Sequence, residues 1–134
     1  MIPLNYIVNF FKGGTFLYVL LLMYNFNNYS NGMILYFFIH GSYGWAWIYK
    51  DIFFPDASFR IKGTIGSSIL VCVFLIIYWS ISLPLALGLS NNSPSIERMI
   101  YCSVIYIVGV ALMLGADYQK TKTLEKRKGI NTVI

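Results

Sequence analysis

Four long runs of apolar residues, separated by short polar segments, dominate the pattern of the chain. A helix needs about 20 such residues to cross the ~30 Å hydrocarbon core of a bilayer. The pattern therefore predicts an all-α, polytopic membrane protein with a single transmembrane domain over residues 1–134 and a basic tail over residues 117–134. The four expected spans cover approximately residues 7–26, 33–49, 64–89 and 99–116.

Some local signals modify this pattern. The first span is the weakest, because Lys12 and the glycines after it interrupt the apolar run. The third span is long enough to tilt and contains Pro84 near its end. Before the fourth span, Pro94 suits the first turn of a helix, and we expect Ser93 to be its N-cap. The loop DIFFPDASFRIKG mixes aromatic residues with charges of both signs, which predicts a segment that lies in the membrane interface.

The composition supports a membrane protein. Hydrophobic residues make up 57% of the chain and charged residues only 11%, whereas a soluble domain has about 25% charged residues. A nucleic-acid partner is not expected for so small a membrane protein. Cys72 and Cys102 lie in apolar runs without a CxxC spacing, so we interpret them as small hydrophobic residues. The first residues lack the basic region and cleavage site of a secretory signal peptide.

The basic residues are distributed unevenly around the four expected spans. Nine of the ten lysines and arginines fall on one side of the membrane, and only Arg98 falls on the other. By the positive-inside rule, both termini are expected on the cytoplasmic side, or on the matrix side of a mitochondrial inner membrane. The basic residues expected to contact lipid headgroups are Lys120, Lys122, Lys126, Arg127 and Lys128.

The stretch FIHGSYGWAWIYKD contains the only histidine of the chain, His40. An ionisable group inside a span is a functional candidate, and beside Tyr36 and Tyr43 the imidazole could relay protons or bind a quinone or steroid carbonyl. The alternative is a neutral histidine that hydrogen-bonds a neighbouring helix. Small residues permit close helix packing, and tryptophans next to a lysine are typical of a membrane interface. The packing and interface residues predicted in this way are His40, Gly41, Gly44, Trp45, Trp47, Gly63 and Gly66.

No complete catalytic constellation is visible in the sequence. There is no GxGxxG, P-loop, HExxH or GxSxG motif, and a lone histidine does not make a metal site. Catalytic and metal-ligating residues are therefore not expected. Asp117 ends the last apolar run, where the helix dipole disfavours a negative charge. A cation such as Lys120, or a ligand, is expected to compensate it.

Two stretches, HGSYGWAWIYKDIFFPD and LMLGADYQKTKTLEKRKGI, together resemble parts of the steroid 5-alpha-reductase-like superfamily, which also includes the isoprenylcysteine methyltransferases. The first is similar to the second span and following loop of that family, and the second to the segment that leads into its C-terminal domain. The resemblance implies an NADPH pocket to which Asp117 and either Lys126 or Arg127 contribute. The family's further cofactor motifs do not follow in these 134 residues, so we expect the pocket to be incomplete.

Two functional hypotheses remain. In the first, the chain is a non-catalytic, supernumerary subunit of a larger membrane complex, placed in the mitochondrial respiratory chain, with other subunits and phospholipids as partners and no cofactor. In the second, the chain is the N-terminal half of an NADPH-dependent membrane lipid or sterol reductase. A channel has little support, because the spans carry too few polar residues to line a pore.

Overall fold

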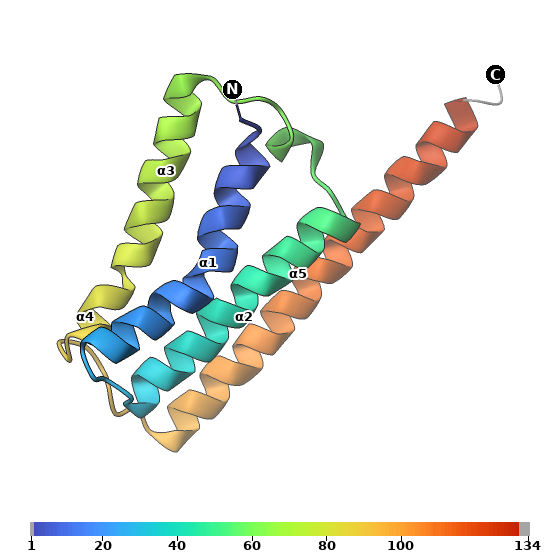
Figure 1. The fold of residues 1–134 in the computed structure, drawn as a ribbon. Coiled ribbons are helices and arrows are strands. Elements are labelled where there is room, and N and C mark those ends of the chain that lie inside the picture. The colour runs from blue at the N-terminus through green and yellow to red at the C-terminus, as the bar shows by residue number, and fades with distance from the viewer. Residues whose placement is uncertain (1, 132–134) are drawn as a thin grey trace.

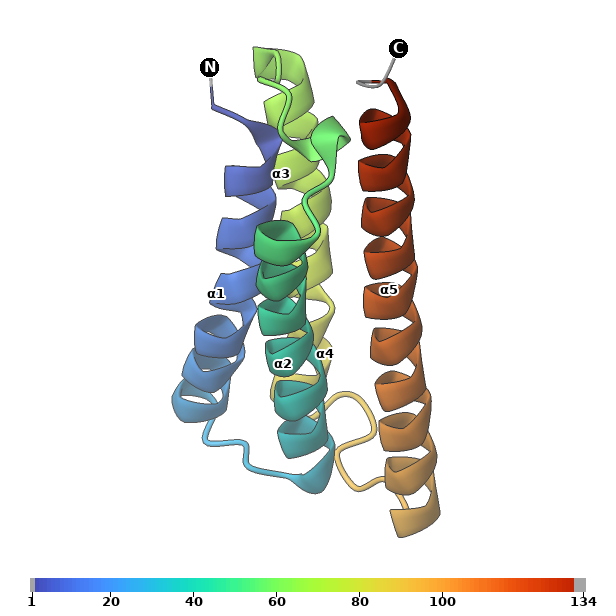
Figure 2. The same cartoon turned by 90° about the vertical axis from the view of Figure 1, so that its right-hand side faces the viewer.

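The structure is a computed structural model that describes residues 2–131, and this part of the chain is helical and contains no β-strand. The helices form one bundle (Figures 1 and 2). Three helical segments are long and apolar enough to cross a membrane: Leu4–Asn25, Ile65–Ala86 and Ile96–Gly129. The prediction of an all-α protein with helices able to span a membrane is confirmed. The elements in chain order are α1 (Leu4–Asn25), α2 (Asn31–Phe53), the 3₁₀ helix η1 (Ala57–Phe59), α3 (Ile65–Ser80), α4 (Ser82–Ala86) and α5 (Ile96–Asn131).

An antiparallel hairpin of α1 and α2 forms the centre of the bundle (Figure 1). Helix α3 packs on α1, and α5 packs mainly on α2. The small hydrophobic core lies near the α1–α2 turn and consists of Val19, Leu22, Met23, Met33 and Ala86. The start of α1, the end of α2 and the end of α5 lie at the opposite end of the bundle (Figure 1).

Glycines bring the two central helices into close contact. A Cβ added at Gly41 would lie 2.8 Å from the ring of Phe16, and one at Gly44 would overlap the carbonyl oxygen of Lys12. On the facing side, a Cβ at Gly13 would lie 2.5 Å from Ile48. The glycines after Lys12 therefore do not interrupt α1, because the contact with α2 compensates for their low helix propensity.

Trp79 connects α3 to α1. Its indole Nε1 donates to the carbonyl oxygen of Phe11 at 3.1 Å and to the hydroxyl of Thr15 at 3.0 Å. The indole also stacks on Tyr18 with the ring centroids 4.4 Å apart. Thr15 is 1% exposed, so this contact satisfies polar groups that the low-dielectric interior would otherwise penalise.

Asparagines join the two loops at the core end. The side-chain nitrogen of Asn28 donates to the carbonyl oxygens of Leu85 and Ala86, at 2.9 and 3.0 Å. The side-chain nitrogen of Asn92 also donates to the carbonyl oxygen of Leu85, and the backbone carbonyl oxygen of Asn92 accepts from the backbone N–H of Gly32. The α1–α2 turn thereby caps the C-terminal end of α4, whose carbonyls lack helical partners.

The third expected span matches a helical segment, Ile65–Ala86, that is long and apolar enough to cross a membrane, and one expectation about the fourth helix is corrected. The third apolar run forms two helices, since α3 ends at Ser80 and α4 covers only Ser82–Ala86. Pro84 has no N–H to donate to the carbonyl of Ser80, which explains the break. The expectation that Ser93 caps the fourth helix, with Pro94 in its first turn, is wrong. Helix α5 begins at Ile96, and the hydroxyl of Ser95 accepts from the N–H of Arg98 at 3.3 Å.

Candidate functional site

Charged side chains gather where α1 begins and α2 ends. We name this group the interfacial charge cluster, and it consists of Lys50, Asp51, Asp56, Arg60, Asp117 and Lys120. Lys50 and Asp51 lie near the C-terminal end of α2, the η1 loop follows this helix directly, and α5 runs past its end (Figure 1), so the chain brings these charges together.

Asp51 is held mainly by α1. Its carboxylate accepts hydrogen bonds from the side-chain amides of Asn5 at 3.2 Å and Asn9 at 2.8 Å. Arg60 lies 3.6 Å from the same carboxylate and donates to the backbone carbonyl of Asp51 at 2.7 Å. The two asparagines are four residues apart, so they lie on one face of α1 and both donate to the same carboxylate.

Lys50 and Lys120 connect the remaining acids. The ammonium of Lys50 lies 3.2 Å from Asp117, and that of Lys120 lies 2.9 Å from Asp56 and 3.8 Å from Asp117. The hydrogen bond from Lys120, together with those from Ser58, lowers the pKa of Asp56 from its ordinary value of 3.8 to about 2. The η1 loop is thereby attached to α5 by an ion pair.

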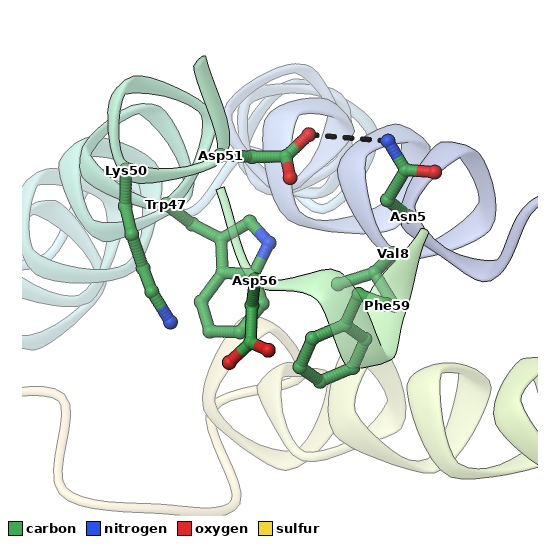
Figure 3. Close-up of a pocket in the computed structure, with 7 residues that line it drawn as sticks. All are labelled: Asn5, Val8, Trp47, Lys50, Asp51, Asp56 and Phe59. Carbon is green, nitrogen blue, oxygen red and sulfur yellow. Dashed lines mark hydrogen bonds between the residues drawn. The ribbon is translucent and has the colours of Figure 1, made fainter. Parts of the chain in front are cut away.

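The space inside the cluster is small. Figure 3 shows Lys50 beside the ring of Trp47, and Phe59 beside Asp56. The enclosed volume is about 10 Å³, which is room for one water molecule. Every carboxylate of the cluster already has a hydrogen-bonded or ionic partner. The arrangement acts as a brace between α1, α2, η1 and α5, and it has no space for a cofactor.

A second unusual group lies in the middle of the bundle. The ammonium of Lys12 on α1 lies over the rings of Tyr78 at 4.0 Å, Tyr43 at 4.8 Å and Trp47 at 5.8 Å from the ring centroids. No acidic side chain forms an ion pair with it in residues 2–131. Cation–π attraction stabilises such a charge by about 0.5–2 kcal/mol, so the aromatic rings replace a counter-ion.

His40 is adjacent to this group. Its imidazole stacks on Tyr36 at 3.9 Å between centroids and lies 6.1 Å from the ring of Tyr78. The Nδ1 atom of His40 and the hydroxyl oxygen of Tyr78 are buried and have no hydrogen-bond partner of normal geometry among the described residues. Buried polar atoms of this kind call for an explanation, such as a bound molecule.

The other predicted residues are dispersed. Gly63 lies against Leu4, whereas Gly66 faces open space. Trp45 is 57% exposed on the outer face of α2, while the ring of Trp47 packs edge-on against Phe59. The residues with exposed side chains toward the end of α5 include Lys120, Lys122, Lys126, Arg127 and Lys128.

The residues proposed for NADPH all lie on α5. Asp117 is occupied by Lys50 and Lys120. Lys126 and Arg127 lie nine and ten residues further along the continuous helix α5, which places them about 14 Å away along its axis at 1.5 Å per residue.

Three residues of these groups, Lys12, Asn5 and Asn9, are not among the site residues predicted from the sequence. The signal for Lys12 lies on α2, where Tyr43 and Trp47 at four-residue spacing form an aromatic face that suits a cation. Asn5 and Asn9 have the same spacing and were not singled out.

Comparison of the chain with protein-family models, with curated proteins and with solved structures finds no match in any of the three. Its function is therefore inferred from its own residues and geometry.

Proposed function

We propose that the chain is a non-catalytic, structural subunit of a larger membrane protein complex. The supporting observation is the apolar outer surface of α3 and α5, which no other described part of the chain covers. Such a surface is suited to lipid or to the helices of another membrane protein. Its exposed residues include Ile65, Ile69, Leu70, Val73, Phe74, Ile76 and Ile77 on α3, and Ile100, Val104, Ile105, Ile107, Val108 and Leu112 on α5.

Glycines on these outer faces favour a protein partner. A Cβ added at Gly66, Gly109 or Gly115 would meet no atom of the chain within 4 Å. A glycine inside a helix costs roughly 0.5–1 kcal/mol relative to alanine, and nothing within the chain compensates for that cost at these positions. Small residues permit close approach of a neighbouring transmembrane helix, so a helix of another subunit is the proposed partner.

The proposal includes four spans, with α2 as the second. Helix α2 has 23 residues, about 34 Å at 1.5 Å per residue, which is long enough to cross. Helices α1 and α3 begin at the same end of the bundle (Figure 1), so α2 has to return the chain between them. Glycines and polar side chains lower the mean hydropathy of α2, but several of them contact other helices of the bundle. Gly41 and Gly44 face α1, and the hydroxyl of Ser42 lies 2.7 Å from that of Tyr106 on α5.

Charge supports the orientation that we propose. With four spans, eight of the ten basic residues belong to the side that holds both termini, whereas Lys12 lies within α1 and Arg98 belongs to the other side. By the positive-inside rule, the side with eight basic residues is the cytoplasmic or matrix side. We place the protein in the mitochondrial inner membrane, in a complex of the respiratory chain.

The end of α5 is proposed to bind phospholipid. It continues beyond the end of α2 as an exposed helical arm (Figure 1). Basic residues near an anionic leaflet contribute about 1 kcal/mol each. The arm therefore contributes to the attachment of the subunit at the headgroup level through Lys122, Lys126, Arg127 and Lys128, with Lys120 shared between lipid and the ion pairs described above.

The alternative, an N-terminal half of an NADPH-dependent reductase, lacks a supporting observation. Its proposed aspartate, Asp117, is already ion-paired within the chain. The experiment below distinguishes this alternative from the proposed subunit.

Gentle solubilisation of the native membrane, followed by native electrophoresis, tests the proposal. We expect the protein to migrate with a large multi-subunit complex. Migration as a small particle that binds NADPH, with binding weakened by Asp117→Ala, would contradict the proposal and favour the reductase.

A variant sharpens the test. Gly109→Leu adds a side chain where the chain itself has free space, so it should leave the fold intact and release the protein from the complex. Val108→Leu, on a neighbouring exposed position, serves as the matched control and should remain assembled. If Gly109→Leu also remains assembled, this face of α5 contacts lipid and not another subunit.

A further inference from the structure

A cavity of about 290 Å³ opens between α2 and the start of α5, at the end of the bundle opposite the interfacial charge cluster. Its volume is close to the lower limit of the roughly 300–1,000 Å³ found for small-molecule sites. The lining residues on α2 extend from Gly32 to His40, a distance of about 12 Å at 1.5 Å per residue. The apolar part of the wall is formed by Leu35, Ile39, Leu85, Pro94 and Cys102. An elongated, apolar cavity of this size suits one alkyl chain.

A single basic residue borders this cavity. Arg98, in the first turn of α5, lines it together with Asn91. In residues 2–131, no acidic side chain forms an ion pair with Arg98. Guanidinium groups bind carboxylates and phosphates through paired, charge-assisted hydrogen bonds. An unpaired arginine beside an apolar cavity therefore favours an occupant with an anionic head.

The far part of the cavity contains polar rings. His40 and Tyr36, stacked on each other, both line it. The buried Nδ1 atom of His40 lacks a hydrogen-bond partner of normal geometry among the described residues. The cavity is thus charged near Arg98, apolar along its walls and weakly polar near His40.

We propose that this cavity binds a single-chain anionic amphiphile of the fatty-acid class. The carboxylate contacts Arg98, and the alkyl chain lies along α2 toward His40. The first carbons of the chain fill the cavity, and the rest of a long chain such as that of oleate leaves through its open side. An anionic bilayer phospholipid offers the same chemistry, but its two chains do not both fit. This site does not depend on the assembly proposed above.

Alkylation of Cys102 reports occupancy through a change in its rate, because this exposed residue borders the cavity. The full chain carrying Cys72→Ser, which removes the other cysteine, is reconstituted in nanodiscs of phosphatidylcholine and treated with N-ethylmaleimide at increasing oleate concentration. Oleate is expected to slow the alkylation in a saturable manner. Arg98→Gln should raise the oleate concentration needed by about tenfold, since it removes a hydrogen bond to a charged group, and Arg98→Lys should restore part of the affinity.

Three controls make the result decisive. Glu97→Gln, on the adjacent residue outside the cavity wall, should leave protection unchanged, and oleyl alcohol should protect the Arg98→Gln variant and the parent equally. Ile39→Trp should abolish protection by filling the cavity, with helix content checked by circular dichroism. Absence of protection by oleate, or equal protection in the parent and Arg98→Gln, would overturn the proposal. So would equal protection by nanodiscs containing phosphatidylglycerol without oleate, which would assign the cavity to a bilayer phospholipid.

Discussion

Lys50 and Asp117 lie 3.2 Å apart, ammonium to carboxylate, and join the C-terminal end of α2 to α5. Their side chains are only 12% and 14% exposed, so both charges are largely withdrawn from water. Removing one partner of such a pair leaves the other charge without compensation. The pair therefore fixes α5, which has few other contacts, against α2.

Asp117→Asn should lower the free energy of unfolding by about 3 kcal/mol, because Lys50 then loses its main partner. Thermal and denaturant unfolding in detergent micelles measure this change. The double variant Lys50→Met with Asp117→Leu should recover most of the loss, since it removes both charges. Glu125→Gln breaks the exposed pair with Lys122 and should change stability by less than about 0.5 kcal/mol. Equal effects of Asp117→Asn and Glu125→Gln would contradict a structural role for Lys50–Asp117.

Trp79→Phe should destabilise the protein by about 1–2 kcal/mol, because the hydrogen bonds to Phe11 and Thr15 are lost and the buried Thr15 hydroxyl loses a donor. Unfolding followed by circular dichroism provides the measurement. Trp45→Phe makes the same chemical change at a side chain that is 57% exposed, and it should be close to neutral. If both variants are neutral, the indole N–H of Trp79 does not anchor α3.

Gly44→Ala should weaken the α1–α2 hairpin by at least about 1–3 kcal/mol, because the added Cβ overlaps the carbonyl oxygen of Lys12 and the helices have to separate. Gly109→Ala is the matched control. Its Cβ meets nothing, and the higher helix propensity of alanine should raise stability by up to about 1 kcal/mol. Comparable stabilities of the two variants would show that the helices are not in close contact at Gly44.

The pH dependence of stability should reveal the link between Asp56 and Lys120. The pKa of Asp56 is about 2 in the folded protein and 3.8 in the ordinary case. The ionised carboxylate therefore stabilises the fold above pH 3.8, and this contribution is lost as the pH falls through about 2. Wild type should be more stable than Asp56→Asn near neutral pH, and the difference should shrink between these two pH values. A difference that is constant over this range would show that the carboxylate is not ionically held.

The orientation of the termini tests the four-span arrangement. With four crossings, tags placed at the two ends should be labelled from the same side of sealed membrane vesicles, because each crossing reverses the side. Labelling from opposite sides would mean that one of the helices, most simply α2, does not cross. Substituting Lys62 and Arg60 together should leave the labelling pattern intact, since the remaining basic residues still lie on that side.

The helices themselves follow closely from the order of residues, because an apolar run of sufficient length forms a helix wherever it is buried or in lipid. The expected spans at 33–49 and 99–116 lie within α2 and α5. Pro84 is visible in the sequence, but the position of the helix break, four residues before it, is seen only in the structure. The exact cap of α5 also differed, because Ser93 and Ser95 flank Pro94 and only the folded loop selects Ser95.

What the sequence by itself determined is the helical class, the apolar character and the concentration of basic residues, since all three depend on composition and order along the chain. The tertiary structure alone decided which groups meet. Tyr78 is 66 positions from Lys12 in the chain, and Asp117 is 67 positions from Lys50.

 Residues this far apart in the chain cannot be paired from the sequence pattern, because their contact depends on the close packing of α1 and α2 at glycines and on how α3 and α5 pack against this pair. The ring of Tyr78 reaches Lys12, and Lys50 reaches Asp117, only once that packing has brought distant segments to the same level of the bundle. The cavity beside Arg98 has the same origin, since its wall is shared between α2, the end of α4 and the start of α5.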